Sequence, residues 1–239
     1  MTEQSSTAQS VKRALAEVAD PDKAVHSKSF FKAHPGGYGE GDHFLGIKVP
    51  EQRKIARAHR DLSLTEIGKL VRSRYHEHRL TGFFILIHRY ERGDDRTRKK
   101  VYAFCIKHLA HLDNWDLVDT VAPKLIGPHM RAHPDHKSAL YTWAGSTDLW
   151  ERRIAMLATL AFIRQGEFAD ALAIAQALVR DPHDLIHKAV GWMLREIGNR
   201  DRAVEEAFLD EHARDMPRTM LRYAIEKFPA ARRQHYMQR

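Results

Sequence analysis

A tryptophan and an aspartate four residues apart, Trp115 and Asp119, are the first candidates for chemistry in this sequence. They lie in a stretch, NWDLVD, that opens a predicted helix, because Asp113 or Asn114 can cap its first turn. Residues four apart share one face of a helix. An indole beside a carboxylate offers a flat π surface and a negative charge, which suit a cationic ligand or a positively charged transition state. The alternative is a core tryptophan beside a capping or salt-bridging aspartate.

The composition indicates a globular protein with a polyanionic partner. The chain has 239 residues, of which 43% are hydrophobic and 29% are charged, enough for one large domain or two small ones. Its formal net charge of +8 favours nucleic acid as the partner over a role in solubility alone. The basic residues are spread along the chain, which favours a folded basic face over a disordered arm.

The ends and the single cysteine limit the class of protein. No apolar run approaches the ~18 residues of a transmembrane helix, so we expect no membrane association. Residues 1–10 are polar and lack a signal-peptide core, so we expect them to be disordered. We expect residues 11–239 to form a single domain. Cys105 is the only cysteine, which excludes internal disulfides and cysteine-rich zinc sites. We expect it to be buried and inert, in a cytoplasmic protein.

The apolar residues recur with helical spacing along most of the chain, and no alternating strand pattern is present. This predicts an all-α fold. The expected helices span residues 11–19, 51–60, 64–73, 76–91, 97–112, 115–131, 137–145, 148–164, 168–179, 185–197, 202–214 and 218–228. The glycine-rich stretch 34–46 lacks the flanking strand and the Gly-Lys-Ser/Thr of a phosphate loop, so we expect an ordered loop with Tyr38 facing a ligand.

A weak internal repeat predicts that these helices stack into an α-solenoid. Charged residues that enter apolar helices recur at spacings of 37, 37, 35 and 34 residues, at Arg79, Asp116, Arg153, Lys188 and Arg222. Repeats of this length, with two helices each, are typical of α-solenoids, in which equivalent positions line one concave stripe. The stripe is therefore expected to be a concave basic groove with one acidic interruption beside Trp115.

Residues from three successive repeats converge on the predicted groove: Trp115 and Asp119, then Arg153, then Trp192 and Arg195. Two aromatic rings and a carboxylate in a basic channel suit a site that holds DNA by its phosphates and presents the rings and one charge to a sugar or base. The alternatives are intramolecular pairs, Arg153 with Glu151 and Arg195 with Glu196, and a core position for Trp192.

Several longer motifs resemble, in the same order, those of the AlkD-type DNA alkylation repair glycosylases, which are built of HEAT-like helical repeats. The resemblance runs from about Asp22 to Phe228. The motifs are YGEGDHFLG at 38–46, VPEQRK at 49–54, NWDLVD at 114–119, STDLWERR at 146–153, HKAVGWMLRE at 187–196 and MPRTMLRYAIEKF at 216–228. Together they are much more specific than any one of them.

The resemblance implies roles for individual residues. Asp119 matches the family's catalytic aspartate, and Trp115 and Trp192 match its active-site tryptophans. Arg153 and Arg195 match its phosphate contacts, and Tyr38 its lesion-proximal tyrosine. The basic stripe adds two DNA-binding candidates, Lys188 and Arg79.

The implied reaction is hydrolysis of the N-glycosidic bond of cationic N3- or N7-alkylated purines in duplex DNA. A carboxylate near C1′ stabilises the oxocarbenium-like sugar more than the ground state. The cationic base departs neutral, so no general acid is needed. The expected enzyme is a monofunctional, monomeric glycosylase that uses no cofactor and does not enclose the base.

Other functions remain open at this stage. The same groove suits a non-catalytic protein that binds DNA structures, and a helical-repeat scaffold suits an acidic protein partner. His76-Glu77-His78 and the pair His183 and His187 resemble metal-binding spacings, but the pair has no evident third ligand, so we expect no metal site.

Overall fold

The computed structural model describes residues 7–238, and within that range it consists of helices joined by turns and loops. The only β-type pairing among these residues is an isolated bridge between His43 and Tyr75. The predicted all-α class is confirmed. None of the helices in that range has the length and apolar character needed to span a membrane.

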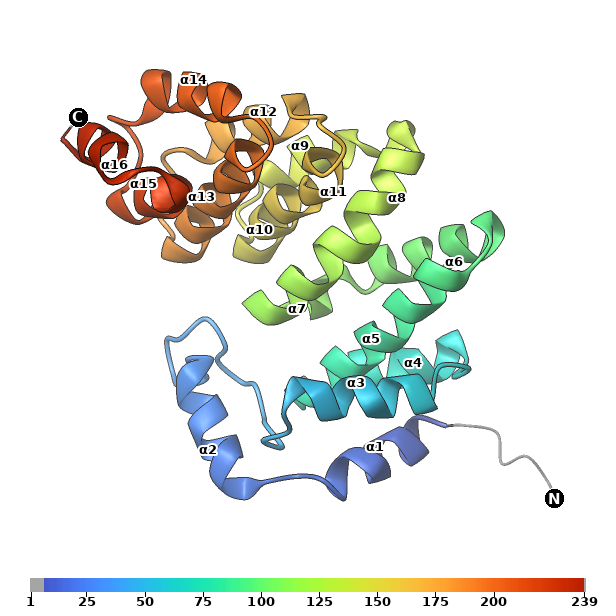
Figure 1. The fold of residues 1–239 in the computed structure, drawn as a ribbon. Coiled ribbons are helices and arrows are strands. Elements are labelled where there is room, and N and C mark those ends of the chain that lie inside the picture. The colour runs from blue at the N-terminus through green and yellow to red at the C-terminus, as the bar shows by residue number, and fades with distance from the viewer. Residues whose placement is uncertain (1–6, 239) are drawn as a thin grey trace. The chain divides into compact units, whose positions relative to one another are not determined.

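Contacts between Cα atoms divide the chain into two compact units, Met1–Leu117 and Val118–Arg239. The division falls inside helix α7 (Trp115–Val121). A single domain over residues 11–239 stays a prediction. The helices of the first unit that precede α7 are α1 (Ala8–Ala16), α2 (Pro21–Phe30), α3 (Val49–Ala58), α4 (Leu64–Val71), α5 (His76–Arg92), α6 (Asp95–Lys107) and the short η1 (Leu109–His111) (Figure 1).

The second unit continues with helices of similar length. They are η2 (Ala122–Ile126), α8 (Gly127–Ala132), η3 (Pro134–His136), α9 (Ser138–Ala144), α10 (Leu149–Ala158), α11 (Leu160–Ile163), α12 (Ala169–Leu178), α13 (Asp184–Gly198), α14 (Arg202–His212), α15 (Arg218–Ala224), η4 (Ile225–Lys227) and α16 (Ala230–Met237). The five charged residues of the predicted repeat lie in α5, α7, α10, α13 and α15, each within the first five residues of its helix. The concave basic groove stays a prediction.

The first helix begins inside the stretch that was expected to be disordered. Thr7 caps α1 by accepting a hydrogen bond from the Ser10 amide at 3.2 Å. The Ala8 amide donates to Glu66 of α4 at 2.8 Å, and Val11 is buried. Order therefore begins by residue 8 because α1 has both a cap and a packing partner; residues 1–6 lie outside the described range.

Helix α5 is the centre of the first unit, and α3, α4 and α6 pack against it. Its Glu77 carboxylate accepts hydrogen bonds from three backbone amides of the loop between α2 and α3, those of Leu45, Gly46 and Ile47, at 2.9, 2.8 and 3.3 Å. Gly46 has a φ of +75°, and an added Cβ would lie 2.1 Å from the carbonyl oxygen of Asp20. The glycine-rich stretch is therefore an ordered loop, as expected.

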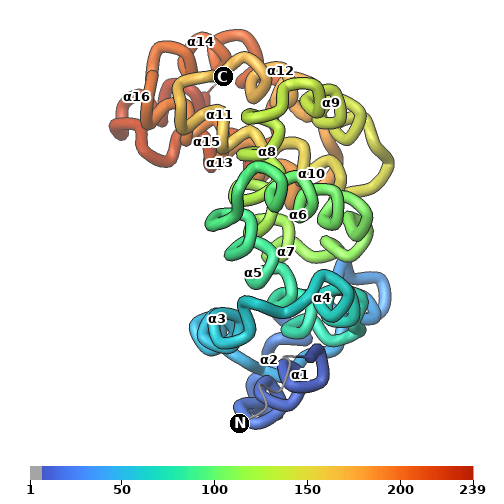
Figure 2. The backbone as a smooth tube through the Cα atoms, turned by 90° about the vertical axis from the view of Figure 1, so that its right-hand side faces the viewer, coloured from blue at the N-terminus to red at the C-terminus, as the bar shows by residue number. Residues whose placement is uncertain are grey.

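In the second unit, α13 and α15 run side by side (Figure 1, Figure 2). A glycine allows this approach, because an added Cβ at Gly191 would lie 2.4 Å from the carbonyl oxygen of Met220. Helix α10 packs against α9 and α13 through buried side chains such as Ile154 and Leu157. The backbone positions of α10 and α13, which carry most of the predicted site residues of this unit, are thus fixed by a continuous core.

The helix predicted over residues 115–131 is interrupted by a π-helical turn, η2, which follows α7 directly. Pro123 has no N–H to donate to the carbonyl of Asp119, so the regular i to i−4 pattern fails there. The Gly127 amide instead donates to the carbonyl of Ala122, five residues earlier. This irregular turn begins three residues after Asp119.

Candidate functional site

An ion pair between α7 and α10 holds the Asp119 carboxylate in place. Arg153 donates from Nε to Oδ1 and from Nη2 to Oδ2 of Asp119, both at 2.8 Å, and from Nη1 to the carbonyl of Leu185. The Arg153 side chain is buried, with 5% of its surface exposed, whereas the Asp119 side chain keeps 21% exposed. The carboxylate is therefore held in position by Arg153 and keeps part of its surface exposed.

The position of Arg153 follows from the start of α10. Asp148 caps this helix, because its Oδ1 accepts hydrogen bonds from the amides of Trp150 and Glu151 at 2.6 and 3.2 Å. Arg153 then lies one turn into the helix, among buried residues.

The next predicted residues lie on α13. Trp192 is partly exposed, and its Nε1 donates to Glu196 Oε1 at 3.3 Å. Arg195, also partly exposed, forms an ion pair with Glu226. Lys188 pairs with Asp184 one turn earlier, at 2.7 Å, and keeps 38% of its side chain exposed. Of the predicted site residues, the second unit therefore carries Asp119, Arg153, Trp192 and two partly exposed cations, Lys188 and Arg195.

In the first unit, Trp115 lies against an aromatic cluster at the end of α2. Its ring stacks on Phe31, with centroids 5.4 Å apart, and meets the edge of Phe30 at 5.8 Å. Phe30 keeps 56% of its surface exposed although it is a large apolar residue. Tyr38 lies near this cluster, since its hydroxyl donates to the carbonyl of Phe30 at 3.5 Å.

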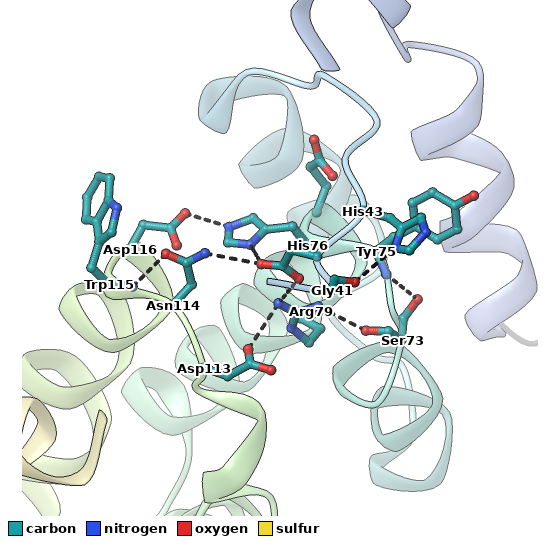
Figure 3. Close-up of polar contacts among 12 residues, drawn as sticks. Gly41, His43, Ser73, Tyr75, His76, Arg79, Asp113, Asn114, Trp115 and Asp116 are labelled. Carbon is teal, nitrogen blue, oxygen red and sulfur yellow. Dashed lines mark hydrogen bonds and ion pairs between the residues drawn. The ribbon is translucent and has the colours of Figure 1, made fainter. Parts of the chain in front are cut away.

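A buried polar cluster lies beside Trp115 (Figure 3). Its central residue is His76, which is 2% exposed and has a carboxylate at each ring nitrogen. Nδ1 lies 3.1 Å from Asp42 Oδ2, and Nε2 lies 2.8 Å from Asp116 Oδ2. Asp42 also accepts hydrogen bonds from Arg79 and, at 3.1 Å, from Asn114 Nδ2. Asn114 Oδ1 in turn accepts the Trp115 amide at 2.8 Å.

The charged groups of this cluster stabilise the ionised forms of His76 and Asp42. Burial alone would lower the pKa of His76, but Asp116 and Asp42 outweigh this effect and raise the pKa to about 9. Burial would raise the pKa of Asp42, yet the hydrogen bond to His76 and the charge of Arg79 lower it. The ring of His76 is therefore an imidazolium at neutral pH.

The histidines with metal-like spacings have structural roles. His78 shares a hydrogen bond with Ser73 at 2.8 Å, and Glu77 binds the loop amides. His183 caps α13 by accepting the Leu185 amide at 3.1 Å, and His187 contacts the carbonyl of Asp181. Within the described range, no three His, Cys, Asp or Glu side chains are arranged to hold a metal ion.

A family model described as "DNA alkylation repair enzyme" matches residues 11–228 of the sequence. The chain belongs to the DNA alkylation repair enzyme family. This membership supports a role in the repair of alkylated DNA.

The fold is also found among solved structures. A structure described as "Predicted DNA alkylation repair enzyme from Enterococcus faecalis" superposes with a TM-score of 0.69 at 17% sequence identity, over 89% of this chain and 97% of that chain. No curated protein matched the sequence in a significant way.

Two arginines that were predicted to contact DNA are buried in ion pairs in this structure. Arg79 is 3% exposed and is paired with Asp42 and, at 3.0 Å, with Asp113, so it is not available to a phosphate. The guanidinium of Arg153 is committed to Asp119 and Leu185. The alternative partners that the sequence offered, Glu151 for Arg153 and Glu196 for Arg195, are replaced by Asp119 and Glu226.

The sequence patterns missed the aromatic and polar partners of Trp115. Phe30 is the last residue of α2 and Phe31 follows it; this helix has no buried residue and therefore no apolar stripe. His76 was considered only as a metal ligand. Its partners Asp42 and Asp116 are 34 and 40 residues away in the sequence, so local spacing carried no signal for this contact.

Proposed function

We propose that this enzyme is a DNA glycosylase that excises cationic N3- or N7-alkylated purines from duplex DNA. The observation that carries the proposal is the Asp119 carboxylate, fixed by two hydrogen bonds from a buried arginine and still partly exposed. A negative charge held in a set position is what the developing positive charge on the sugar requires. Asp119 thus stabilises the oxocarbenium-like transition state and positions the attacking water.

The reaction needs little more from the protein. Alkylation at N3 or N7 gives the purine a positive charge, so breaking the bond to C1′ releases a neutral base without a general acid. Water then adds to C1′ and loses a proton to solvent, which leaves an abasic site in an intact strand. We assign no cofactor and no metal to this chemistry.

Aromatic faces are assigned to the sugar and its neighbours. Trp115 and Trp192 would contact the electron-poor deoxyribose, with cation–π interactions of about 0.5–2 kcal/mol each. The exposed Phe30, at the edge of Trp115, extends this aromatic surface. Tyr38 lies close enough to this cluster to keep its proposed place near the lesion.

DNA binding is assigned to exposed cations, and Arg153 receives a different role. Lys188 and Arg195 would contact phosphates, with Glu226 releasing Arg195 on binding. Arg153 is the positioning residue for Asp119. We propose that the protein acts as a monomer, in the cytoplasm, on duplex DNA and without a closed pocket for the base.

The test is release of 7-methylguanine from methylated duplex DNA by the wild-type protein. We expect free base in the supernatant and strands that break only after alkali treatment, because a monofunctional glycosylase leaves an abasic site. Binding of the duplex without release of 7-methylguanine or of a more labile cationic adduct would contradict the proposal and favour a protein that binds DNA structures.

A further inference from the structure

We propose that His76 is the positioning residue for Trp115: its charged ring, clamped between Asp42 and Asp116, holds the first turn of α7 and with it the indole. This inference rests on the proposed function for the role of the indole, but not for the role of His76. Two independent routes lead from the His76 ring to Trp115, one polar and one aromatic.

The polar route uses both ring nitrogens. Nε2 of His76 contacts Asp116, the residue after Trp115, at 2.8 Å. Nδ1 contacts Asp42, which binds Asn114 Nδ2 at 3.1 Å, and Asn114 accepts the Trp115 amide (Figure 3). The residues on both sides of Trp115 are therefore tied to the same ring.

The aromatic route runs through stacked rings. The His76 ring contacts both Phe44 and Phe31, with centroids 5.1 and 4.8 Å away, and these two phenyl rings stack on each other at 5.3 Å. Phe31 then stacks on Trp115 at 5.4 Å with an interplanar angle of 27°. Aromatic pairs at these distances prefer defined relative orientations. A change in the His76 ring therefore reaches the indole face as well as its backbone.

The role depends on the charge of the ring, because only an imidazolium donates from both nitrogens. The charged groups that face it are Asp42 from the loop, Asp116 from α7, Arg79 from α5 and Asp113 from the segment before α7. The backbone N–H of His76 is also fixed, since it donates to the carbonyl of His43 at 2.8 Å. Neutral substitutes of similar size retain one of the two contacts at most.

The experiment compares His76→Gln with His78→Gln. His78 lies on the same helix and is nearly as buried, but its ring shares a hydrogen bond with Ser73 and not with a carboxylate of this cluster. The chain has four tryptophans, so indole N–H signals in NMR spectra report on each ring, and Trp115→Phe assigns the relevant one. This readout requires neither DNA nor catalysis.

In His76→Gln we expect the Trp115 indole and amide signals to shift while those of Trp143 and Trp150 stay in place. The wild-type Trp115 signals should titrate with His76 near pH 9. His78→Gln should leave them unchanged. If His76→Gln does not fold, Asp116→Asn is used instead, because it removes one of the two carboxylates that contact the His76 ring. It is expected to shift the same Trp115 signals.

Unmoved Trp115 signals in the folded His76→Gln or Asp116→Asn variant, or equal shifts in His78→Gln, would overturn the inference. The effect on catalysis is measured in a separate experiment. In His76→Gln, kcat for 7-methylguanine release should fall roughly 10-fold to 100-fold, since small misplacement of a catalytic group costs this much, while Kd for the duplex changes little. If the wild-type protein releases no base, the proposed function fails and the NMR result still decides the role of His76.

Discussion

The Asp119 carboxylate and the Arg153 guanidinium face each other in a two-bond ion pair, with both nitrogen–oxygen distances at 2.8 Å. Arginine forms such a pair because its planar fork matches the two carboxylate oxygens. A third bond, to the carbonyl of Leu185, ties the guanidinium to the start of α13. Asp119 is therefore positioned by two helices besides its own.

Replacement of Arg153 by lysine should lower the rate of base release far more than it lowers DNA affinity. Arg153→Lys retains the charge but cannot bind both oxygens of Asp119 and the Leu185 carbonyl at once. We expect kcat to fall at least about 10-fold, measured in single-turnover release of 7-methylguanine. Duplex affinity should change little, because a buried guanidinium makes no phosphate contact. A loss of duplex affinity larger than the loss of release rate would assign Arg153 to a phosphate after all.

Lys188→Gln should change the salt dependence of DNA binding and leave the rate of base release nearly unchanged. Each phosphate contact that is lost lowers the slope of log K against log salt concentration by about 0.9. We expect that change in fluorescence titrations of a labelled duplex, with little effect on kcat at saturating enzyme. Lys99 is a matched control, because it forms a similar ion pair one turn from Asp95 and lies off the predicted stripe. Equal slope changes in Lys99→Gln would refute a specific role for Lys188.

Glu205 should make the stability of the protein depend on pH. Burial raises its pKa to about 8 from an ordinary value of 4.5, and its side chain packs against Gly198. The folded state therefore keeps a proton that the unfolded state loses above about pH 4.5. The free energy of unfolding due to this group is expected to fall as the pH rises from 4.5 to 8.

The neutral variant Glu205→Gln should lack this fall in the free energy of unfolding with rising pH. At pH 8 we expect its Tm to exceed the wild-type value, by roughly 2–4 °C for each kcal/mol recovered, and at pH 4.5 the advantage should vanish. Thermal unfolding followed by circular dichroism measures both. The adjacent Glu206, which pairs with Arg232, serves as a control, because Glu206→Gln should not gain stability at pH 8. An unchanged pH profile in Glu205→Gln would contradict a protonated buried carboxyl.

Close packing of α13 against α15 should make Gly191 intolerant of a methyl group. In Gly191→Ala, the added Cβ would lie 2.4 Å from the Met220 carbonyl oxygen and 2.5 Å from Tyr223 Cβ. Overpacking of this kind costs about 1–3 kcal/mol. Urea unfolding measures the loss. In Gly145→Ala, whose nearest atoms lie 3.7 Å away, the stability should change by less than about 0.5 kcal/mol. Equal stabilities of the two variants would be incompatible with this packing.

Apolar spacing predicted most helices because most of them bury one face. Helix α2 was missed because none of its residues is buried, and Pro21, which follows the helix predicted over residues 11–19, is its first residue. Helix α16 was not predicted for a similar reason, since Tyr236 is its only buried residue. The interruption at η2 follows from the missing N–H of Pro123, which a count of apolar residues ignores.

The sequence named candidate site residues but not the contacts that they make. The motifs named Asp119 and Arg153, yet the repeat pattern gave Arg153 and Arg79 the same exposed place as Lys188. Burial separates them: both arginines pair with carboxylates that their local sequence does not contain. The partners of His76 come from the α2–α3 loop and α7, and a contact of this kind depends on tertiary packing.

The most direct test of the central claim is single-turnover release of 7-methylguanine from methylated duplex DNA by the wild-type protein and by Asp119→Asn. Asparagine keeps the size of the side chain and removes its charge. We predict that the wild-type protein releases the base, that Asp119→Asn is slower by at least about 100-fold, and that both bind the duplex with similar Kd. Asp135→Asn, at an exposed aspartate of η3, should match the wild type. Undiminished release by Asp119→Asn would contradict the assignment of Asp119 as the catalytic carboxylate.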